Sequence, residues 1–296
     1  MSESKLTKPL VVIPEWKSES SPHGNSYWSQ FQAGCPHQRV LNKRYADLLR
    51  DMELDEDEAS ATAIGSAFHK ILEHYYRGTL DEVAFDSDNA AVAEALRIFG
   101  SYRLRFPVQE FGDVVGTEYS FGFDTPAEGS PAPYSPVGVT PFTGRIDMVV
   151  NVTNDAHIEW LQSPNGRNLP VSKKGIYLLD HKTMGQRRQT IEMEFMNSFQ
   201  FHAYMMCWDV LYGETQGYCN GMIANCVVRH KTMNERSFFS VFVPPPTPAQ
   251  QQAVRSHFQM AKSLQETYGD DYKNRSYCFS WGKVCPHFRS GACDRT

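Results

Sequence analysis

Residues 176–183 read Ile-Tyr-Leu-Leu-Asp-His-Lys-Thr, an apolar run that ends in a carboxylate and a lysine one residue apart. The run predicts a short buried strand, and alternate residues of a strand point to the same face. Asp180 and Lys182 are therefore expected on one face at the end of this strand. A carboxylate and an ammonium so placed can hold a divalent metal ion and orient a water molecule. The alternative for an isolated pair of this kind is a surface ion pair.

Composition sets wide bounds on the class of protein. The 296 residues are 41% hydrophobic and 21% charged, which is ordinary globular usage, and the length allows one large domain or two small ones. No apolar run approaches the ~20 residues of a membrane span, and the polar start at residues 1–8 is followed by no apolar segment. We therefore expect an intracellular protein that makes no membrane contact. The net charge of −5 excludes a generic polyanion binder, so contact with nucleic acid requires local basic groups or a metal ion.

The flanking sequence predicts a mixed α/β domain over residues 25–296, preceded by a flexible tail at 1–24. Helical periodicity predicts helices over 26–50 (interrupted at 34–36), 63–77, 89–106, 190–212 and 247–268. Strands are predicted over 114–123, 143–152, 176–182, 218–229 and 237–243, with a proline-rich loop at 124–141, a polar hairpin tip at 160–174 and an irregular Cys-rich tail at 277–296. This order of elements predicts a central sheet flanked by helices.

Polar residues mark three of these elements. His69 follows Gly65 on a predicted helix in a Gly-x-x-x-His pattern, and Asp147 ends a Gly-x-x-Asp pattern on a predicted strand. Gln200 and Tyr204 are four residues apart on a helix and so share one face. Each has an ordinary interpretation when taken alone: a surface histidine, a strand-edge carboxylate, and a hydrogen-bonded pair in the core.

Taken in order, these groups resemble the motifs of the RecB-like branch of the PD-(D/E)XK nuclease superfamily. That branch is marked by a helical Gly…His, a Gly-x-x-Asp, an Asp-x-Lys-Thr and a Gln-hydrophobic-x-x-Tyr, and all four occur here in that order. The start of the chain, with Ser29, Phe31, Cys35, Pro36 and Arg39, is similar to the Cys-Pro motif of the same enzymes. The resemblance spans about residues 26–293 and implies a restriction-endonuclease-like core.

The resemblance also implies a set of site residues. The catalytic residues would be Asp147, Asp180, Lys182, Glu118, Gln200 and Tyr204, and the ligands of Mg²⁺ or Mn²⁺ would be His69, Asp147, Asp180 and the backbone carbonyl of His181. Lys182 would position the attacking water or stabilise the pentavalent phosphorus. Gln200 and Tyr204 would hold the DNA strand or a base near the metal. Glu118, which is an ordinary strand residue on the simpler interpretation, would contact a water near the metal.

Seven cysteines, an odd number, argue against a disulfide framework, and Cys207, Cys219 and Cys226 lie among apolar residues typical of a core. The other four are Cys35, Cys278, Cys285 and Cys293, and the last three are separated by six and seven residues. These gaps are wider than those of zinc knuckles or ferredoxins and alone indicate free thiols. RecB-like nucleases of the AddB type and of CRISPR adaptation have one Cys near the start and three near the end. The resemblance therefore implies a structural four-iron four-sulfur cluster, with zinc or no metal as alternatives.

The implied function is a metal-dependent deoxyribonuclease, acting as an exonuclease on single-stranded DNA ends in recombination, repair or phage DNA processing. Its setting would be the cytoplasm of a bacterium or of a phage-infected cell. No helicase P-loop is present, so unwinding would require a helicase or recombination partner. The alternatives are a structure-specific or nicking endonuclease, a DNA-end-binding assembly subunit with a vestigial site, and an iron–sulfur redox module. Phosphate contacts are expected from local basic residues: Arg39, Lys43, Arg44, Arg187 and Arg188.

Overall fold

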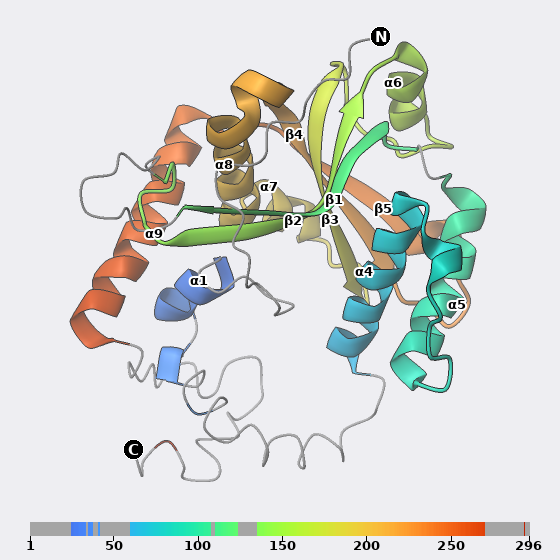
Figure 1. Ribbon diagram of the computed structural model, residues 1–296, viewed down its shortest axis with the longest axis horizontal. Helices are drawn as coiled ribbons and strands as arrows, with labels where there is room; N and C mark the ends of the chain where they lie inside the picture. Colours follow the sequence, from blue (N-terminus) through green and yellow to red (C-terminus); the bar gives the residue numbers. More distant parts are fainter. Residues whose placement is uncertain are drawn as a thin grey trace.

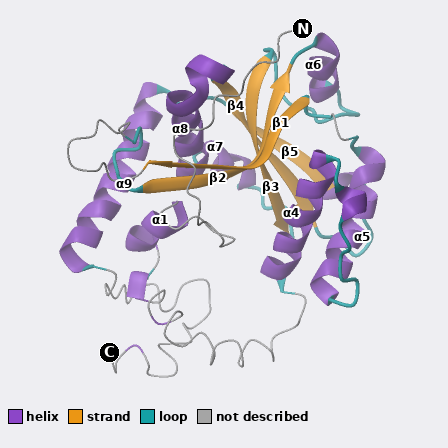
Figure 2. Cartoon of the chain, in the orientation of Figure 1, coloured by secondary structure: helices purple, strands orange, loops and turns teal. Residues whose placement is uncertain are grey.

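The computed structural model describes residues 25–33, 35–37, 41, 60–107, 110–123, 135–269 and 293. The predicted tail at 1–24, most of the predicted loop at 124–141, the basic residues Arg39, Lys43 and Arg44, and Cys278 and Cys285 lie outside these residues. The described residues form a mixed α/β fold, in which helices flank a five-stranded sheet (Figures 1 and 2). The fold class predicted from the sequence is confirmed at this level.

The sheet has the strand order β1-β2-β3-β4-β5, the same as the order along the chain. The strands are β1 Asp113–Phe123, β2 Phe142–Val152, β3 Gly175–Met184, β4 Cys219–Val228 and β5 Phe238–Val243. Neighbours are antiparallel except β3 and β4, which are parallel. A parallel pair needs a crossover connection, and the helices between β3 and β4 supply it.

Helices cover both faces of this sheet. They are α1 Asn25–Ala33, α4 Ala61–Arg77, α5 Ala90–Arg105, α6 Asp155–Gln162, α7 Ile191–Met196, α8 Phe199–Gln216 and α9 Pro248–Tyr268, with short 3₁₀ turns at Leu80–Glu82 and Glu235–Ser237. One core lies between the sheet and α4 and α5, and the other lies between the sheet and α1, α8 and α9. The first and last of these helices, α1 and α9, lie side by side (Figure 1). None of the described helices is both long enough and apolar enough to cross a membrane.

The connection between β2 and β3 differs from its prediction. We expected a polar hairpin tip at 160–174, but the chain first forms α6, in which the Asn154 side chain accepts a hydrogen bond from the His157 backbone N–H. Leu161 is the buried residue of this short helix. A helix with one buried apolar position gives no periodic signal, which explains the wrong prediction.

The predicted helix over 190–212 is two helices. Ser198 separates α7 from α8, and its hydroxyl accepts a hydrogen bond from the Phe201 N–H at 3.3 Å, as an N-cap does. The predicted end at residue 212 is four residues short, because α8 runs through Gly213 to Gln216 and ends at Gly217. A side chain at Gly213 would collide with the ring of Tyr218, so this glycine serves close packing rather than termination.

The helix predicted over 63–77 is confirmed as α4, which ends at Gly78. Tyr76, which lies outside its apolar stripe, is buried as well. The reason is that α5 packs beside α4, and the Tyr76 hydroxyl meets the Tyr102 hydroxyl at 2.7 Å. The predicted core positions of Cys207, Cys219 and Cys226 are confirmed, since all three are buried.

Candidate active site at the fork between β2 and β3

Two strands separate at the centre of the candidate site. β2 and β3 are paired from Val152↔Gly175 to Met148↔Leu179, and the described residues form no β2–β3 pair beyond that point. Asp147 and Asp180 are the next residue on each strand. The His181 backbone N–H lies beyond the β2–β3 ladder and donates to Asp147 Oδ2 at 2.7 Å. The fork therefore places two carboxylates, from β2 and β3, on either side of one opening.

Asp180 and Lys182 lie on one face, as strand alternation predicted. Lys182 Nζ is 2.6 Å from Asp180 Oδ2, and Asp180 is 4% exposed. Burial raises the pKa of Asp180, the Lys182 ammonium opposes this, and the Asp147 carboxylate raises it again. Burial alone would lower the pKa of Lys182, but Asp180 and Asp147 raise it above its usual value. The Asp180 charge therefore helps to hold Lys182 as an ammonium ion, while the burial of Asp180 outweighs the effect of this partner on its own pKa.

The helix α4 brings His69 to the same carboxylates. His69 Nδ1 lies 3.4 Å from Asp147 Oδ2, and 29% of its side chain is exposed. Burial alone would raise the pKa of Asp147, but His69, His181 and Lys182 together lower it. Asp147 and His69, predicted from separate motifs, thus meet in the structure.

Glu118 stands opposite Asp147 in an unusual backbone conformation. Its neighbours Thr117 and Tyr119 pair with Met148 and Ile146, the residues on each side of Asp147. Its φ is 50°, in the left-handed region that side-chain-bearing residues rarely adopt, at a cost of about 1–3 kcal/mol. Arg145 Nε lies 2.6 Å from its Oε2. Burial raises the pKa of Glu118, and Arg145 opposes that rise.

Gln200 and Tyr204 approach the fork from the first turns of α8. Tyr204 is 5% exposed. Burial raises its pKa to about 12, and the hydrogen bond from Gln200 moderates this rise. The carboxylates of Asp180 and Asp147 also raise it. Tyr204 is therefore a protonated phenol, able to donate a hydrogen bond, close to both carboxylates.

The glycines of two motifs have a packing reason. A Cβ at Gly65 would lie 3.0 Å from Thr183 Oγ1, so glycine allows α4 to approach the end of β3 closely. A Cβ at Gly144 would overlap the ring of Phe121, which lies over it from β1. Phe121 in turn meets Tyr204 edge to face, with ring centres 5.3 Å apart. The absence of a side chain at Gly144 thus makes room for the Phe121 ring, which packs against Tyr204.

We expect Gly144→Ala to destabilise the protein by about 1–3 kcal/mol, the usual effect of overfilling a packed core. The measurement is the midpoint of urea unfolding. Gly100→Ala is the matched control, because a Cβ there would meet nothing within 4 Å and the position is inside α5. Alanine favours a helix by up to about 1 kcal/mol, so this control should be neutral or stabilising. Equal midpoints for the two variants would contradict this packing argument.

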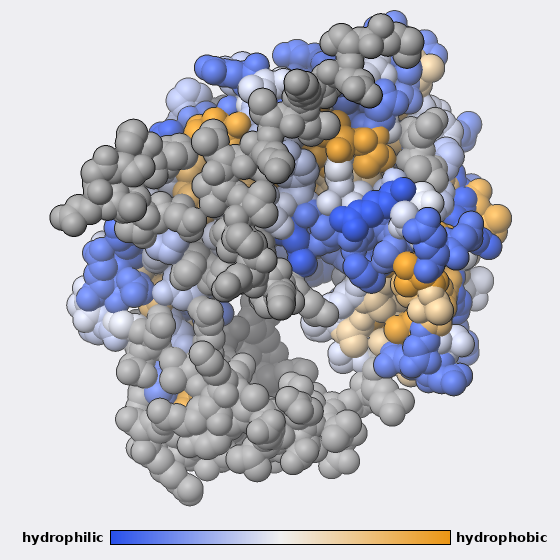
Figure 3. Space-filling view, in the orientation of Figure 1, coloured by the Kyte–Doolittle hydropathy of each residue, from blue (hydrophilic) through white to orange (hydrophobic). Residues whose placement is uncertain are grey.

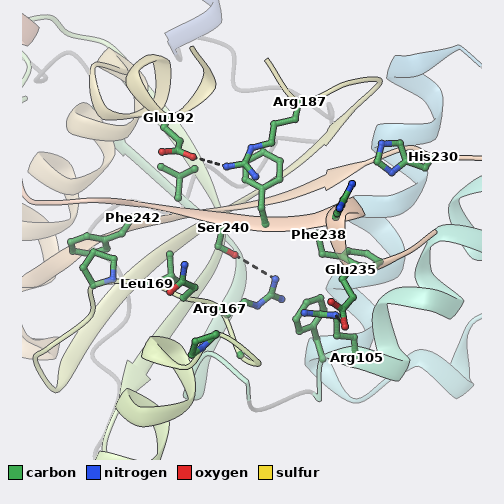
Figure 4. Close-up of a pocket in the computed structure, with 18 of the residues that line it drawn as sticks. Arg105, Arg167, Leu169, Arg187, Glu192, His230, Glu235, Phe238, Ser240 and Phe242 are labelled. Atoms are coloured by element: carbon green, nitrogen blue, oxygen red, sulfur yellow. Dashed lines mark hydrogen bonds and ion pairs between the residues drawn. The ribbon is translucent and has the colours of Figure 1, made fainter. Parts of the chain in front are cut away.

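Two cavities flank the sheet. A cavity of about 830 Å³ opens at the fork and is lined by Gly65, His69, Lys70, Glu73, Glu118, Arg145, His181 and Lys182, among others. Figure 3 shows hydrophilic residues gathered on this side of the molecule, where β1 and α4 lie. A cavity of about 930 Å³ follows the edge strand β5 (Figure 4), with the Arg187 guanidinium 4.3 Å over the Phe239 ring. Four candidate site residues, His69, Glu118, His181 and Lys182, line the first cavity, so its chemistry is the more informative despite its smaller volume.

The donors at the fork fit a hard divalent cation. The His69 imidazole lies 3.4 Å from the Asp147 carboxylate, and Asp180 follows the last β2–β3 pair on the other strand. Mg²⁺ and Mn²⁺ favour oxygen ligands with an occasional imidazole. Within the described ranges, no group of three or more His, Cys, Asp or Glu side chains is already placed to hold a metal ion. Burial raises the pKa of Asp180, and a cation bound beside it would favour the ionised form.

Comparison with known proteins adds little. The chain matches no known protein family and no curated protein. Among solved structures it is similar to the "Crystal structure of SSO0001", at 12% identity and a TM-score of 0.41, over 91% of this chain and 89% of that chain. At this level of similarity, an inference about function depends on the site itself.

Proposed function

We propose that this chain is a divalent-metal-dependent nuclease with a PD-(D/E)XK core, which hydrolyses phosphodiester bonds at single-stranded DNA ends. The observation that carries the proposal is the fork, where Asp147, Asp180 and Lys182 meet beside His69. The motifs come from β2, β3 and α4, far apart in sequence, yet they converge on one cavity. A vestigial site would have no reason to keep this convergence, which disfavours a purely DNA-end-binding subunit.

Each residue has a distinct part in cleavage. Mg²⁺ or Mn²⁺, held by Asp147, Asp180, His69 and the His181 carbonyl, would neutralise phosphate charge and make water acidic enough to attack. Lys182, kept as an ammonium ion by Asp180, holds the attacking water or a phosphate oxygen. The Tyr204 phenol and the Gln200 amide donate to the DNA backbone near the cavity. Glu118, fixed by Arg145, receives a hydrogen bond from a water beside the metal.

Single-stranded ends are proposed as the substrate because broad basic surface is scarce. The net charge is −5, and the basic residues after β3 already have acidic partners: Arg187 with Glu192 and Arg188 with Glu194, each at 2.6 Å. DNA phosphates would have to exchange with these carboxylates, so binding should weaken steeply with added salt. A helicase or recombination partner would supply single strands, and recombination, repair and phage DNA processing remain the proposed settings.

We expect linear single-stranded DNA to be degraded with Mg²⁺ or Mn²⁺ while covalently closed circles of the same sequence persist. End-labelled linear single strands, linear duplexes and closed circles are incubated in parallel, and the products are separated on a denaturing gel. Rapid loss of the circles would exclude an end-dependent mechanism and support the structure-specific or nicking endonuclease instead.

We also propose that Cys35, Cys278, Cys285 and Cys293 bind a four-iron four-sulfur cluster. Two of the four are described: Cys35 and Cys293 are 8% and 4% exposed. The packing of α1 on α9 supports the proposal, because it places the helix before Cys35 beside the helix that leads to the tail. A cluster that joined the two ends would have a structural role. An iron–sulfur redox module without nuclease activity would not explain the residues at the fork.

Anaerobically purified protein should be brown and contain about four irons per chain. Cys35→Ser should lower the iron content and increase proteolysis of the distant tail, because the cross-link between the ends is lost. Cys226→Ala, inside β4, is the control and should retain its iron. Colourless protein with one zinc ion would assign the site to zinc, and metal-free protein would exclude it.

A further inference from the structure

A buried polar network lies behind the candidate site. Arg167, in the connection between α6 and β3, forms a paired contact with Glu110, with Nε–Oε2 and Nη2–Oε1 distances of 2.6 Å. Their side chains are only 1% and 0% exposed. Arg167 Nη1 also donates to Asn225 Oδ1 at 3.0 Å and to Ser240 Oγ at 3.4 Å (Figure 4). The network therefore runs from the cavity beside β5 into the middle of the sheet.

The donors in this network determine the orientation of Asn225. A guanidinium group only donates hydrogen bonds, so the atom of Asn225 that faces Arg167 must be the carbonyl oxygen. The amide nitrogen then faces the Tyr102 hydroxyl at 2.8 Å and His181 Nδ1 at 2.9 Å. Tyr102 accepts from Arg167 and Asn225, and its hydroxyl also contacts Glu110 at 2.9 Å and the Tyr76 hydroxyl at 2.7 Å.

The orientation of Asn225 determines the tautomer of His181. An amide NH₂ group has no lone pair to offer, so His181 Nδ1 accepts and must be unprotonated. The ring proton is then on Nε2. The sequence indicated only a role for the backbone of His181, whereas the network specifies the state of its side chain.

His181 lines the cavity at the fork. It is 3% exposed, and its ring stacks on Tyr76 and meets His69 edge to face. Within the part of the chain that the structure describes, no group accepts a hydrogen bond from Nε2. His181 therefore keeps one ring N–H donor, and it lines the same cavity as Lys182. A donor and a cation together suit an anionic oxygen.

We propose that the neutral His181 side chain donates a hydrogen bond from Nε2 to a phosphate oxygen of the substrate, and that Asn225 is the positioning residue that makes it a donor. The inference rests on the proposed nuclease function, because that function supplies the phosphate. It assigns to His181 a direct substrate contact beside its backbone role, and to Arg167 the task of orienting Asn225.

The tautomer can be measured without any cleavage. Nitrogen-15 NMR of histidine-labelled protein, with the His181 signals assigned by their loss in His181→Gln, should show a protonated Nε2. In Asn225→Asp a carboxylate oxygen faces Nδ1 and should draw the proton there, which reverses the pattern. A protonated Nδ1 in the wild type would overturn the inference whether or not the protein cleaves DNA.

The substrate contact is tested by two matched replacements. The amide of Gln can place its NH₂ near the position of Nε2, whereas that of Asn reaches only the position of Nδ1. At saturating linear single-stranded DNA and Mn²⁺, His181→Gln should keep its cleavage rate within about tenfold of wild type, while His181→Asn and Asn225→Asp should lose about 100-fold, the usual effect of removing one preorganised donor. The Mn²⁺ affinity of all three should be unchanged.

Other outcomes separate this inference from the nuclease proposal. If the wild type cleaves and Asn225→Asp cleaves equally fast, the positioning role is wrong while the nuclease function stands. Loss of Mn²⁺ binding in His181→Gln would make the side chain a metal ligand and overturn the phosphate contact. A wild type that cleaves no DNA would remove the phosphate contact together with the function, and the NMR result would still decide the tautomer.

Discussion

Asp180→Asn should reduce DNA cleavage by at least about 1,000-fold, equivalent to about 4 kcal/mol of transition-state stabilisation. The substitution keeps the size of the side chain but removes the charge that would bind the metal ion and that holds Lys182 as an ammonium ion. The fold should survive. Burial already disfavours the charge of Asp180 and raises its pKa, so replacing the carboxylate with a neutral amide costs the core little. Single-turnover cleavage with Mn²⁺ gives the rate, and urea unfolding gives the stability.

Asp155→Asn is the matched control for this variant. Asp155 is also paired with a lysine, Lys174, at 3.0 Å, but its side chain is 77% exposed and lies on α6, away from the fork. This control should cleave DNA at the wild-type rate. Wild-type activity in Asp180→Asn would show that the fork is not the active site.

Arg167→Met should destabilise the protein by about 3–5 kcal/mol, because it leaves the carboxylate of Glu110 buried without its partner. Burial raises the pKa of Glu110, and the Arg167 guanidinium opposes this rise. In the variant that opposition is lost, and Glu110 should take up a proton, which relieves part of the cost. The urea midpoint measures the loss of stability, and near-ultraviolet circular dichroism of the folded state shows whether the core packing is retained.

A double variant separates the charge from the packing. Arg167→Met combined with Glu110→Leu removes both buried charges and should recover much of the lost stability. Lys174→Met, which breaks an exposed ion pair, should cost less than about 1 kcal/mol. If the free energy of unfolding of Arg167→Met is within about 1 kcal/mol of the wild-type value, the pairing of Arg167 with Glu110 does not stabilise the fold.

Local patterns in the sequence predicted most of the secondary structure. The helix that contains His69 follows a clear apolar period and ends at Gly78, and the apolar run before Asp180 is a strand. The capping box of Thr247 and Gln250 begins α9 where the sequence predicted it. Such features depend on residues a few positions apart, which is why one sequence suffices to find them.

The geometry of the site depends on contacts between distant segments. The register of the two strands sets the point at which β2 and β3 stop pairing, and no residue pattern within either strand predicts that point. The sequence does not predict the left-handed φ of Glu118, since glycine or asparagine is the usual residue in that conformation. Arg167 and Glu110 are 57 residues apart, and neither lies in a motif. The sequence identified candidate ligands, whereas the buried partners that orient them emerged only from the fold.

The most direct test of the proposed function is cleavage of an end-labelled linear single strand as the divalent metal is removed and restored. The wild type should cleave with Mn²⁺, stop when EDTA is added and resume when excess Mn²⁺ is supplied, while Asp180→Asn should remain inactive at every step. Cleavage that continues unchanged in EDTA, or that Asp180→Asn performs at the wild-type rate, would contradict a metal-dependent active site at the fork between β2 and β3.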